Sequence, residues 1–282
     1  MILVTGATGT VGRAVVDRLL ATGAQVRAVT RRPAEANLPS GVQVGYADLD
    51  DPASLAEAFA GVKQVFLLSG GPQIPTHDAN VADAAAREGV THVVKLSSGR
   101  AGDPTATDPI PGWHRVGEQS IRDCGADWTF LRPVGFMSNT LIWAAGIRAQ
   151  GAVFAPYANG RVAVIDPDDI AAVATTVLTT PGHAGQTYEL SGPEALSPSD
   201  QVEVLADVVG RPIRYVEVDP AVARQAIMDH GVAPEMADAI MALRATSLGE
   251  FTAIVRPTVA ELTGRPATTF REWAERNRAS FR

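Results

Sequence analysis

Short apolar runs alternate with amphipathic segments along the first 132 residues of the chain. Several of the apolar runs lack polar alternation, as expected of strands whose two faces are both buried. The pattern predicts strands at residues 2–4, 25–30, 42–44, 65–68, 93–96 and 128–131, and helices at residues 11–20, 54–60, 77–88 and 116–123. Because strands joined by crossover helices form right-handed βαβ units, we predict an α/β fold with a doubly wound, Rossmann-like parallel sheet over residues 1–132.

The pattern is less regular after residue 132. It predicts helices at residues 135–150, 170–178 and 197–209, strands at 187–190 and 213–218, and two or more helices over 221–248. Asn159-Gly160 is a strong turn signal and predicts a hairpin over residues 151–165. We therefore expect residues 133–282 to form a smaller, discontinuous C-terminal α+β lobe that covers the substrate, with some segments of residues 162–190 returning to the main domain.

Composition excludes several classes of protein. Acidic residues outnumber basic ones by 31 to 24, so the chain lacks the basic surplus of a nucleic-acid binder. No apolar run is long enough for a membrane span and no signal peptide is recognisable, so we expect a soluble, cytoplasmic protein. The only cysteine, Cys124, cannot form an intramolecular disulfide or a thiolate metal cluster. We expect no metal, and both a monomer and a homodimer remain open.

The first candidate site is the segment from Thr5 to Gly12, which reads Thr-Gly-Ala-Thr-Gly-Thr-Val-Gly. A glycine-rich turn between a strand and a helix can bring backbone N–H groups against a pyrophosphate, with the helix N-terminus adding partial positive charge. Gly6 would make the tight turn, Gly9 would allow close approach, and Gly12 would let the helix pack on the strand. The segment therefore predicts a phosphate-binding loop that includes Thr8, Thr10 and Val11.

The end of the second strand bears on the choice of dinucleotide. An acidic residue there binds the ribose of NAD, whereas arginine accommodates the 2′-phosphate of NADP. The chain has Arg31 and Arg32 at this position and no acidic residue. A guanidinium matches a phosphate that a carboxylate would repel, so NADP(H) is favoured. The alternative is a pair of solvated surface arginines.

These motifs resemble those of atypical short-chain dehydrogenases, and the chain is similar to their NmrA-like branch, which includes NADPH:quinone oxidoreductases and redox-sensing regulators. The resemblance covers nearly the whole chain. Further matching segments are residues 46–52, 67–70, 113–118, 129–133, 166–170 and 188–192.

The resemblance implies further cofactor-binding residues. Asp48 and Leu49 would flank the adenine, although residues 48–51 also have the composition of a helix-capping loop. The ends of the fourth, fifth and sixth strands would pass the ribose, the pyrophosphate and the nicotinamide. The residues implied there are Leu68, Ser69, Gly70, Ser97, Ser98, Pro133 and Phe136.

One departure from the wider superfamily concerns catalysis. Many short-chain dehydrogenases carry a Tyr-x-x-x-Lys dyad that protonates the substrate oxygen, but residues 113–118 contain neither tyrosine nor lysine. A quinone needs little acid assistance, because it is a strong hydride acceptor and its reduced anion is well stabilised. Placing such an acceptor beside the nicotinamide supplies most of the catalysis.

Two side chains are candidates for a catalytic role. His114 has an ordinary pKa near 6.5 and could deliver a proton near neutrality, with Glu118 one turn away to orient it. Ser97 could polarise a carbonyl oxygen. Each has a structural alternative as a helix or loop cap, and Glu118 has one as a surface residue. We treat the other histidines, His77, His92, His183 and His230, as loop or surface residues.

An apolar cleft would suit a planar substrate. Phe136, Met137, Phe154 and Tyr157 could line it. A stripe of Met236, Ile240 and Leu243 at helical spacing could belong to the core, to a substrate lid or to a dimer face.

Together these features predict an NADPH-dependent oxidoreductase that transfers hydride to a quinone or another activated, conjugated acceptor. Two alternatives remain: a redox sensor that binds NADP without turnover, and a biosynthetic reductase with another substrate.

Overall fold

The computed structural model describes residues 1–282, which divide into two compact units. Unit 1 comprises Met1–Ala106, Pro111–Pro133 and Pro167–Glu189. Unit 2 comprises Thr107–Ile110, Val134–Asp166 and Leu190–Arg282.

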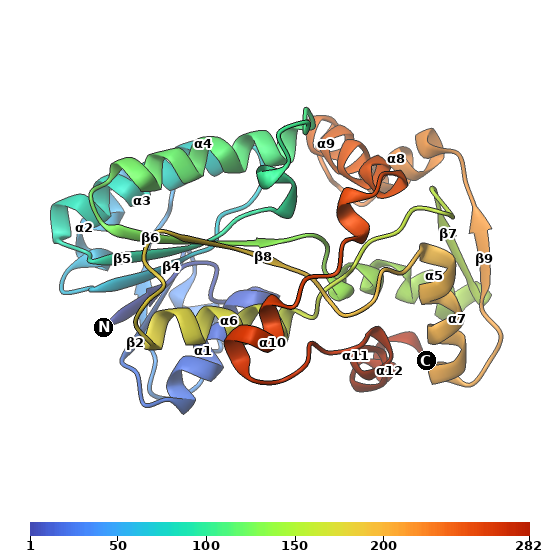
Figure 1. The fold of residues 1–282 in the computed structure, drawn as a ribbon, viewed down its shortest axis with the longest axis horizontal. Coiled ribbons are helices and arrows are strands. Elements are labelled where there is room, and N and C mark those ends of the chain that lie inside the picture. The colour runs from blue at the N-terminus through green and yellow to red at the C-terminus, as the bar shows by residue number, and fades with distance from the viewer. The chain divides into compact units, whose positions relative to one another are not determined.

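Unit 1 is built on a seven-stranded sheet of order β3-β2-β1-β4-β5-β6-β8 (Figure 1). The pairs β1–β2, β2–β3, β1–β4, β4–β5 and β5–β6 are all parallel. The chain moves outward from β1 in both directions, so the strand order reverses between β1 and β4, where ligands bind in open α/β sheets. The predicted doubly wound α/β fold is confirmed. The strands are β1 (Ile2–Val4), β2 (Val26–Thr30), β3 (Gln43–Tyr46), β4 (Gln64–Leu67), β5 (His92–Leu96), β6 (Asp127–Pro133) and β8 (Gln186–Leu190).

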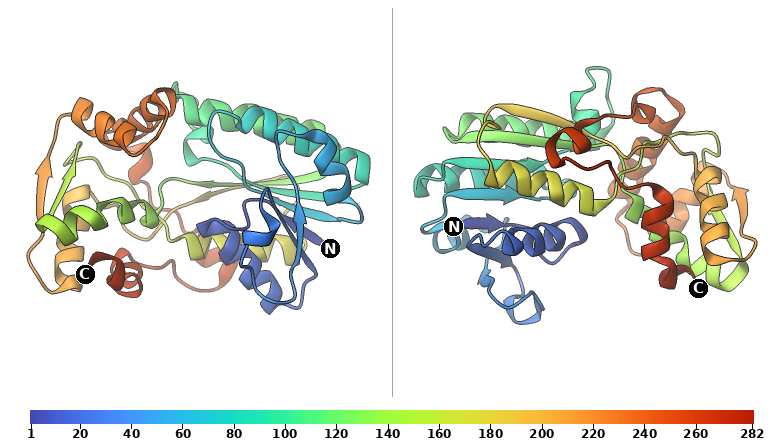
Figure 2. Two further views of the ribbon diagram at one scale, coloured as in Figure 1. Left: turned by 180° about the vertical axis from the view of Figure 1, so that it is seen from behind. Right: turned by 60° about the horizontal axis from the view of Figure 1, so that its bottom comes forward.

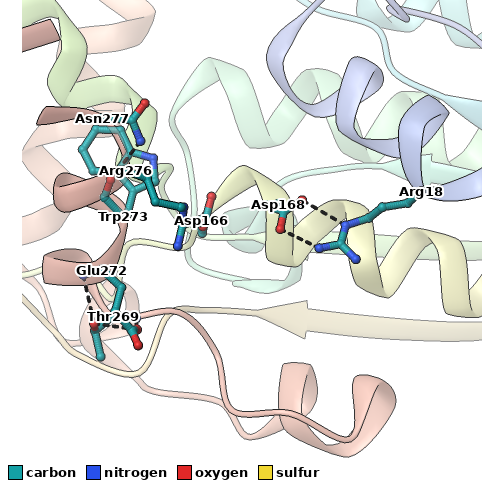
Figure 3. A network of polar contacts seen from close by, with 8 residues as sticks. All are labelled: Arg18, Asp166, Asp168, Thr269, Glu272, Trp273, Arg276 and Asn277. Carbon is teal, nitrogen blue, oxygen red and sulfur yellow. Dashed lines mark hydrogen bonds and ion pairs between the residues drawn. The ribbon is translucent and has the colours of Figure 1, made fainter. Parts of the chain in front are cut away.

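Helices cover both faces of this sheet, as Figures 1 and 2 show from opposite sides. One layer contains α2 (Pro52–Phe59), α3 (Ile74–Glu88) and α4 (Pro109–Asp123), and the other contains α1 (Thr10–Ala21) and α6 (Pro167–Thr179). Arg18 of α1 donates two hydrogen bonds, of 2.9 and 2.5 Å, to the carboxylate of Asp168 of α6 (Figure 3). Short 3-10 turns occur at η1 (Pro33–Glu35) and η2 (Gly99–Gly102).

A hydrophobic core lies between the sheet and α2 and α3. Its buried members include Leu3, Leu55, Phe59, Val65, Leu67, Val81, Ala85, Val93, Ile121 and Phe130. Burial on both faces explains why these strands are apolar runs without alternation. Helix α4 begins at Pro109, seven residues before the predicted start, because prolines are tolerated in a first turn whose N–H groups need no partner within the helix.

Unit 2 combines a small parallel sheet with short helices. Strand β7 (Ala152–Ala155) pairs with β9 (Arg214–Glu217), and the two lie side by side in Figures 1 and 2. The predicted hairpin over residues 151–165 is therefore wrong: Gly160 does close a turn onto the carbonyl of Tyr157 at 2.9 Å, but β7 pairs with a distant strand. The predicted helix over residues 135–150 is divided into η3 and α5. The helical elements are η3 (Met137–Trp143), α5 (Ala144–Gln150), α7 (Pro198–Val209), α8 (Pro220–Asp229), α9 (Pro234–Ala245), η4 (Thr246–Leu248), η5 (Phe251–Ala253), α10 (Thr258–Thr263), α11 (Phe270–Arg276) and α12 (Arg278–Phe281).

The core of unit 2 is formed by α5, β7, α7 and the C-terminal helices. Ile147, Val153, Leu205, Trp273 and Phe281 are among its buried residues. A capping box between Thr269 and Glu272 begins α11, and Arg276 near its end pairs with buried Asp166 (Figure 3). No helix in either unit is both long and apolar enough to cross a membrane.

Candidate functional site

The glycine loop joins β1 to α1 in a conformation that only glycine adopts easily. Gly6 has a φ of +60°, in the left-handed region. A Cβ on Gly12 would lie 2.1 Å from the carbonyl oxygen of Gly6, so the helix can approach the loop only without a side chain there. Thr8, Gly9 and Thr10 are exposed, whereas Val11 is buried beneath them. The loop therefore presents the backbone of Gly9, flanked by the exposed residues Thr8 and Thr10, to the solvent.

The N-terminus of α1 is open to an anion. Its N-cap is Gly9, no side chain caps the helix, and its first turn contains no acidic residue. Such a terminus offers N–H groups and partial positive charge without a competing carboxylate. The residues present thus fit the pyrophosphate of a dinucleotide.

Thr5 fixes the two strand ends at which the sheet order reverses. Its hydroxyl accepts a hydrogen bond from the N–H of Leu68 at 2.7 Å and lies 2.9 Å from the carbonyl oxygen of the same residue. A Cβ on Gly6 would lie 2.9 Å from the Leu68 side chain, so loop and strand are in close contact. Thr5 was not among the predicted site residues, although a polar residue directly after an apolar strand is a signal for it.

The two arginines after β2 differ in their partners. Both are exposed, and Arg32 pairs with Glu35 at 3.1 Å, whereas Arg31 has no ion pair. The loop that follows is held by Arg13 of α1, which donates to the carbonyl oxygens of Ala36 and Asn37 at 3.2 and 2.6 Å. Arg31 is therefore the cation free to meet a phosphate.

The segment after β3 has the local geometry of a capping loop. The Asp48 carboxylate accepts from the N–H of Asp50 at 3.2 Å, and Ser54 bonds both backbone groups of Asp48 at 3.0 Å. The carbonyl of Leu49 accepts from Asn80 at 2.8 Å. One oxygen of Asp48 thus serves the loop itself, and the adenine contacts of Asp48 and Leu49 remain a prediction.

Two of the other histidines are not surface residues, and that expectation was wrong for them. His77 is a partly buried residue of α3 whose Nε2 lies 2.9 Å from Asp50. His92 begins β5, where its Nε2 lies 2.8 Å from the hydroxyl of Thr129 and burial lowers its pKa.

A buried ion pair lies behind the end of β4. Asp78 of α3 and Lys95 of β5 are both 0% exposed and approach to 2.5 Å. No hydrogen-bond partner other than this carboxylate is found for the ammonium. The other Asp78 oxygen accepts a hydrogen bond from the Ser69 hydroxyl at 2.6 Å. No atom lies within 4 Å of the position that a Cβ on the neighbouring Gly70 would take. The pair thus orients a predicted cofactor-binding residue, and sequence reasoning missed both charges.

Ser97, at the end of β5, belongs to a second network. Its hydroxyl donates a hydrogen bond to Glu118 at 2.6 Å, and the guanidinium of Arg132 donates two to the same carboxylate, at 2.8 and 2.6 Å. Burial acts to raise the pKa of Glu118, but hydrogen bonds from Arg132 and Ser97 outweigh it and the pKa is lowered. Glu118, 1% exposed, is therefore neither a surface residue nor bonded to His114. Ser98 is also buried, and its side chain caps nothing.

His114 is not a proton donor of ordinary pKa. It is 8% exposed, and its Nδ1 is buried without a hydrogen-bond partner. Burial, with a smaller contribution from the charge of Lys95, lowers its pKa from 6.5 to about 3. The expectation that it titrates near neutrality is wrong, because burial disfavours the imidazolium. At neutral pH its ring is neutral, with one N–H donor and one acceptor nitrogen.

Unit 2 contains an apolar pocket of about 190 Å³. Phe136 and Tyr157 line it as predicted, and Tyr157 has a φ of +62°, unusual for a residue with a side chain. Met137 and Phe154 do not line it, so that prediction was wrong for both. Met137 is 1% exposed and packs in the core of unit 2, and Phe154 is an exposed residue of β7. Pro133 is the buried last residue of β6, and the pocket lining begins with the next residue, Val134.

The stripe on α9 also reaches this pocket, through Leu243. Beside it stands Arg244, the one charged residue among those lining the pocket. Sequence reasoning missed Arg244, and its only signal is an isolated cation in an otherwise apolar stretch.

The strand order, the glycine loop and the uncapped helix define a dinucleotide-binding protein of the Rossmann-like class. Within that class the chain belongs to the NmrA-like family, whose model matches residues 1–274, and the predicted family is confirmed.

Several of the similar proteins are reductases that act on different acceptors. A (4-alkanoyl-5-oxo-2,5-dihydrofuran-3-yl)methyl phosphate reductase of Streptomyces griseus is 46% identical over 282 residues, which cover 100% of this chain and 99% of the relative. An NAD(P)H azoreductase of Xenophilus azovorans is 38% identical over 286 residues, covering 100% of this chain and 99% of that protein. The structure of an NADPH-dependent quinone oxidoreductase from Escherichia coli in complex with NADPH aligns with a TM-score of 0.88 at 28% identity, covering 98% of this chain and 99% of the other.

Proposed function

We propose that the protein is a cytoplasmic NADPH-dependent oxidoreductase that transfers hydride to a quinone or another activated, conjugated acceptor. The observation that carries this proposal is the combination of an uncapped helix N-terminus after a glycine loop with a buried histidine that stays neutral at pH 7.

The proposed cofactor rests on residues of unit 1. The N–H groups at the start of α1 would hold the pyrophosphate, and Arg31 would pair with the 2′-phosphate that distinguishes NADPH from NADH. Asp48 and Leu49 would flank the adenine. Leu68, Ser69, Gly70, Ser97, Ser98, Pro133 and Phe136 would complete the site at the ends of the strands. The NADPH complex of the similar E. coli enzyme supports this choice.

The proposed acceptor follows from the lack of a strong acid. No tyrosine or lysine occupies residues 113–118, and His114, with a pKa of about 3, holds no proton to give as an imidazolium at neutral pH. These residues therefore fit an acceptor that takes a hydride without prior protonation. Quinones, azo compounds and conjugated lactones share this property, and the names of the similar proteins cover all three kinds.

Bound NADPH would supply the hydride. For a quinone, this hydride gives a hydroquinone anion, which takes one proton from water once it leaves the pocket. The residues of the chain contribute binding and orientation: Thr5 and the glycine loop hold the strand ends, the Asp78–Lys95 pair orients Ser69, and Glu118 orients Ser97. The apolar pocket of unit 2 would bind the acceptor and exclude water.

The test is oxidation of NADPH by the purified protein with a panel of benzoquinones and naphthoquinones, with NADH in parallel. The proposal predicts saturable turnover that prefers NADPH. Protein that binds NADPH with the expected preference yet turns over no acceptor in the panel would contradict it, and would favour a sensor that binds NADP without turnover.

A further inference from the structure

The pocket of unit 2 combines an apolar lining with a single cation. Its aromatic and aliphatic residues include Phe136, Trp143, Val164 and Leu243. Arg244, from the last turn of α9, also lines it, and no aspartate, glutamate, lysine or histidine does. A pocket for a purely apolar molecule would gain nothing from a guanidinium in its wall, because removing that group from water has a cost.

Arg244 also lacks a partner within the protein. No hydrogen bond or ion pair engages its guanidinium, and the nearest acid along α9, Asp238, is held by Arg224 at 2.5 Å. Burial lowers the pKa of Arg244, and only the Tyr157 hydroxyl acts against this. Arginines that stabilise a fold are normally paired, so a half-buried, unpaired one in a pocket wall marks a binding group.

We propose that the ligand of this pocket is a small conjugated molecule that carries an anionic oxygen group, a phosphate ester or a carboxylate, and that Arg244 binds this group. The inference rests on the proposed function and narrows its acceptor to anionic members of the class. A guanidinium presents two parallel N–H groups that match the oxygens of a phosphate or a carboxylate. The Tyr157 hydroxyl and the Ser247 side chain, which share the lining, are additional donors of the right kind.

The experiment measures binding without turnover. Phenyl phosphate, benzoate and phenol share one ring and differ in their charged group, and their Kd values are measured by calorimetry with NADP⁺ at saturation, so that the glycine loop is occupied. The proteins are the wild type, Arg244→Gln, Arg244→Lys and the control Arg214→Gln. Arg214 is an exposed residue of β9 in the same unit and does not line the pocket. Circular dichroism establishes that each variant is folded.

The wild type should bind at least one of the two anions more tightly than phenol, and the preferred one identifies the group. Arg244→Gln should weaken that binding by about tenfold to a hundredfold, the range for loss of a charged hydrogen bond, while Arg214→Gln leaves it unchanged. The affinity of Arg244→Lys for that anion should lie between those of the wild type and Arg244→Gln, because lysine keeps the charge but lacks the two parallel N–H groups of the guanidinium.

Equal binding of phenol and both anions by the wild type would overturn the inference, as would equal weakening by Arg244→Gln and Arg214→Gln. Turnover of neutral 1,4-naphthoquinone by the wild type, measured in parallel, separates the two proposals. A naphthoquinone that carries a carboxylate is assayed beside it. If the neutral quinone turns over and no anion preference is found, only the present inference fails, whereas absence of turnover with both quinones in NADPH-binding protein counts against the proposed function.

Discussion

Replacing Gly117 by alanine would insert a methyl group into the space that Asp78 occupies. An added Cβ would lie 1.9 Å from Oδ2 of Asp78 and 2.8 Å from its Cγ, distances that require the carboxylate to move. Asp78 cannot move freely, because it neutralises Lys95 at 2.5 Å and both side chains are 0% exposed. The substitution therefore acts on a buried ion pair through steric displacement alone.

The magnitude follows from two opposing effects. Disrupting a buried ion pair so that one charge is left unpaired costs about 3–5 kcal/mol. Alanine in place of glycine in a helix interior stabilises the helix by about 1 kcal/mol. We expect Gly117→Ala to lower the free energy of unfolding by about 2–4 kcal/mol, the difference between these terms.

The assay is urea unfolding followed by circular dichroism, with a matched control in the same helix. Gly112 of α4 has nothing within 4 Å of an added Cβ, so Gly112→Ala should be neutral or slightly stabilising. A midpoint for Gly117→Ala that equals that of Gly112→Ala would refute the reasoning. NADPH binding should weaken as well, because Ser69 loses the Asp78 oxygen to which it donates at 2.6 Å.

Three further predictions concern the cofactor loop and the buried histidine. Arg31→Asp should weaken NADPH binding far more than NADH binding in a titration, whereas Arg32→Asp should have the smaller effect because Arg32 is already paired with Glu35; equal losses for both cofactors would remove the role of the 2′-phosphate. Gly12→Ala should lower the thermal midpoint in a melting curve, because its Cβ would lie 2.1 Å from the Gly6 carbonyl oxygen; an unchanged midpoint would show that the loop can yield. The pKa of His114 is about 3 in the folded protein and 6.5 in the unfolded chain, so the unfolded chain takes up this proton first as the pH falls. The contribution of neutral His114 to the free energy of unfolding is therefore complete above pH 6.5 and declines toward pH 3. Between pH 7.5 and pH 5 this loss amounts to about 2 kcal/mol. In urea unfolding, the free energy of unfolding of His114→Gln should fall by about 2 kcal/mol less than that of the wild type over this range, whereas equal falls in both proteins would place the imidazole in contact with water.

The sheet and the glycine loop could be predicted because their signals are local. Buried parallel strands are apolar runs, and the spacing of Gly6, Gly9 and Gly12 places them in one turn between a strand and a helix. Partnerships between distant residues could not be predicted in this way. Asn159-Gly160 correctly indicated a turn, but the partner of β7 is β9, about 60 residues further on, and nothing local specifies that pairing.

Burial was the other quantity that the sequence did not determine. Met137 and Phe136 are adjacent apolar residues, and only the packing decides that one enters the core and the other lines the pocket. The same holds for charge. Lys95 stands in an apolar strand, and nothing local identifies its partner, Asp78, which lies on a helix of ordinary composition. The lowered pKa of His114 likewise depends on its burial, which residues 113–118 do not indicate.

The central claim is that this chain transfers hydride from NADPH to a conjugated acceptor. It is tested most directly by single-turnover oxidation of NADPH with 1,4-naphthoquinone, using unlabelled cofactor and cofactor deuterated at either of the two C4 positions. The account predicts that one of the two deuterated cofactors, and not the other, slows the oxidation severalfold, because that C–H bond breaks in the transfer. Protein that binds NADPH but oxidises none of the three cofactors, with 1,4-naphthoquinone or with a naphthoquinone carboxylate, would contradict hydride transfer.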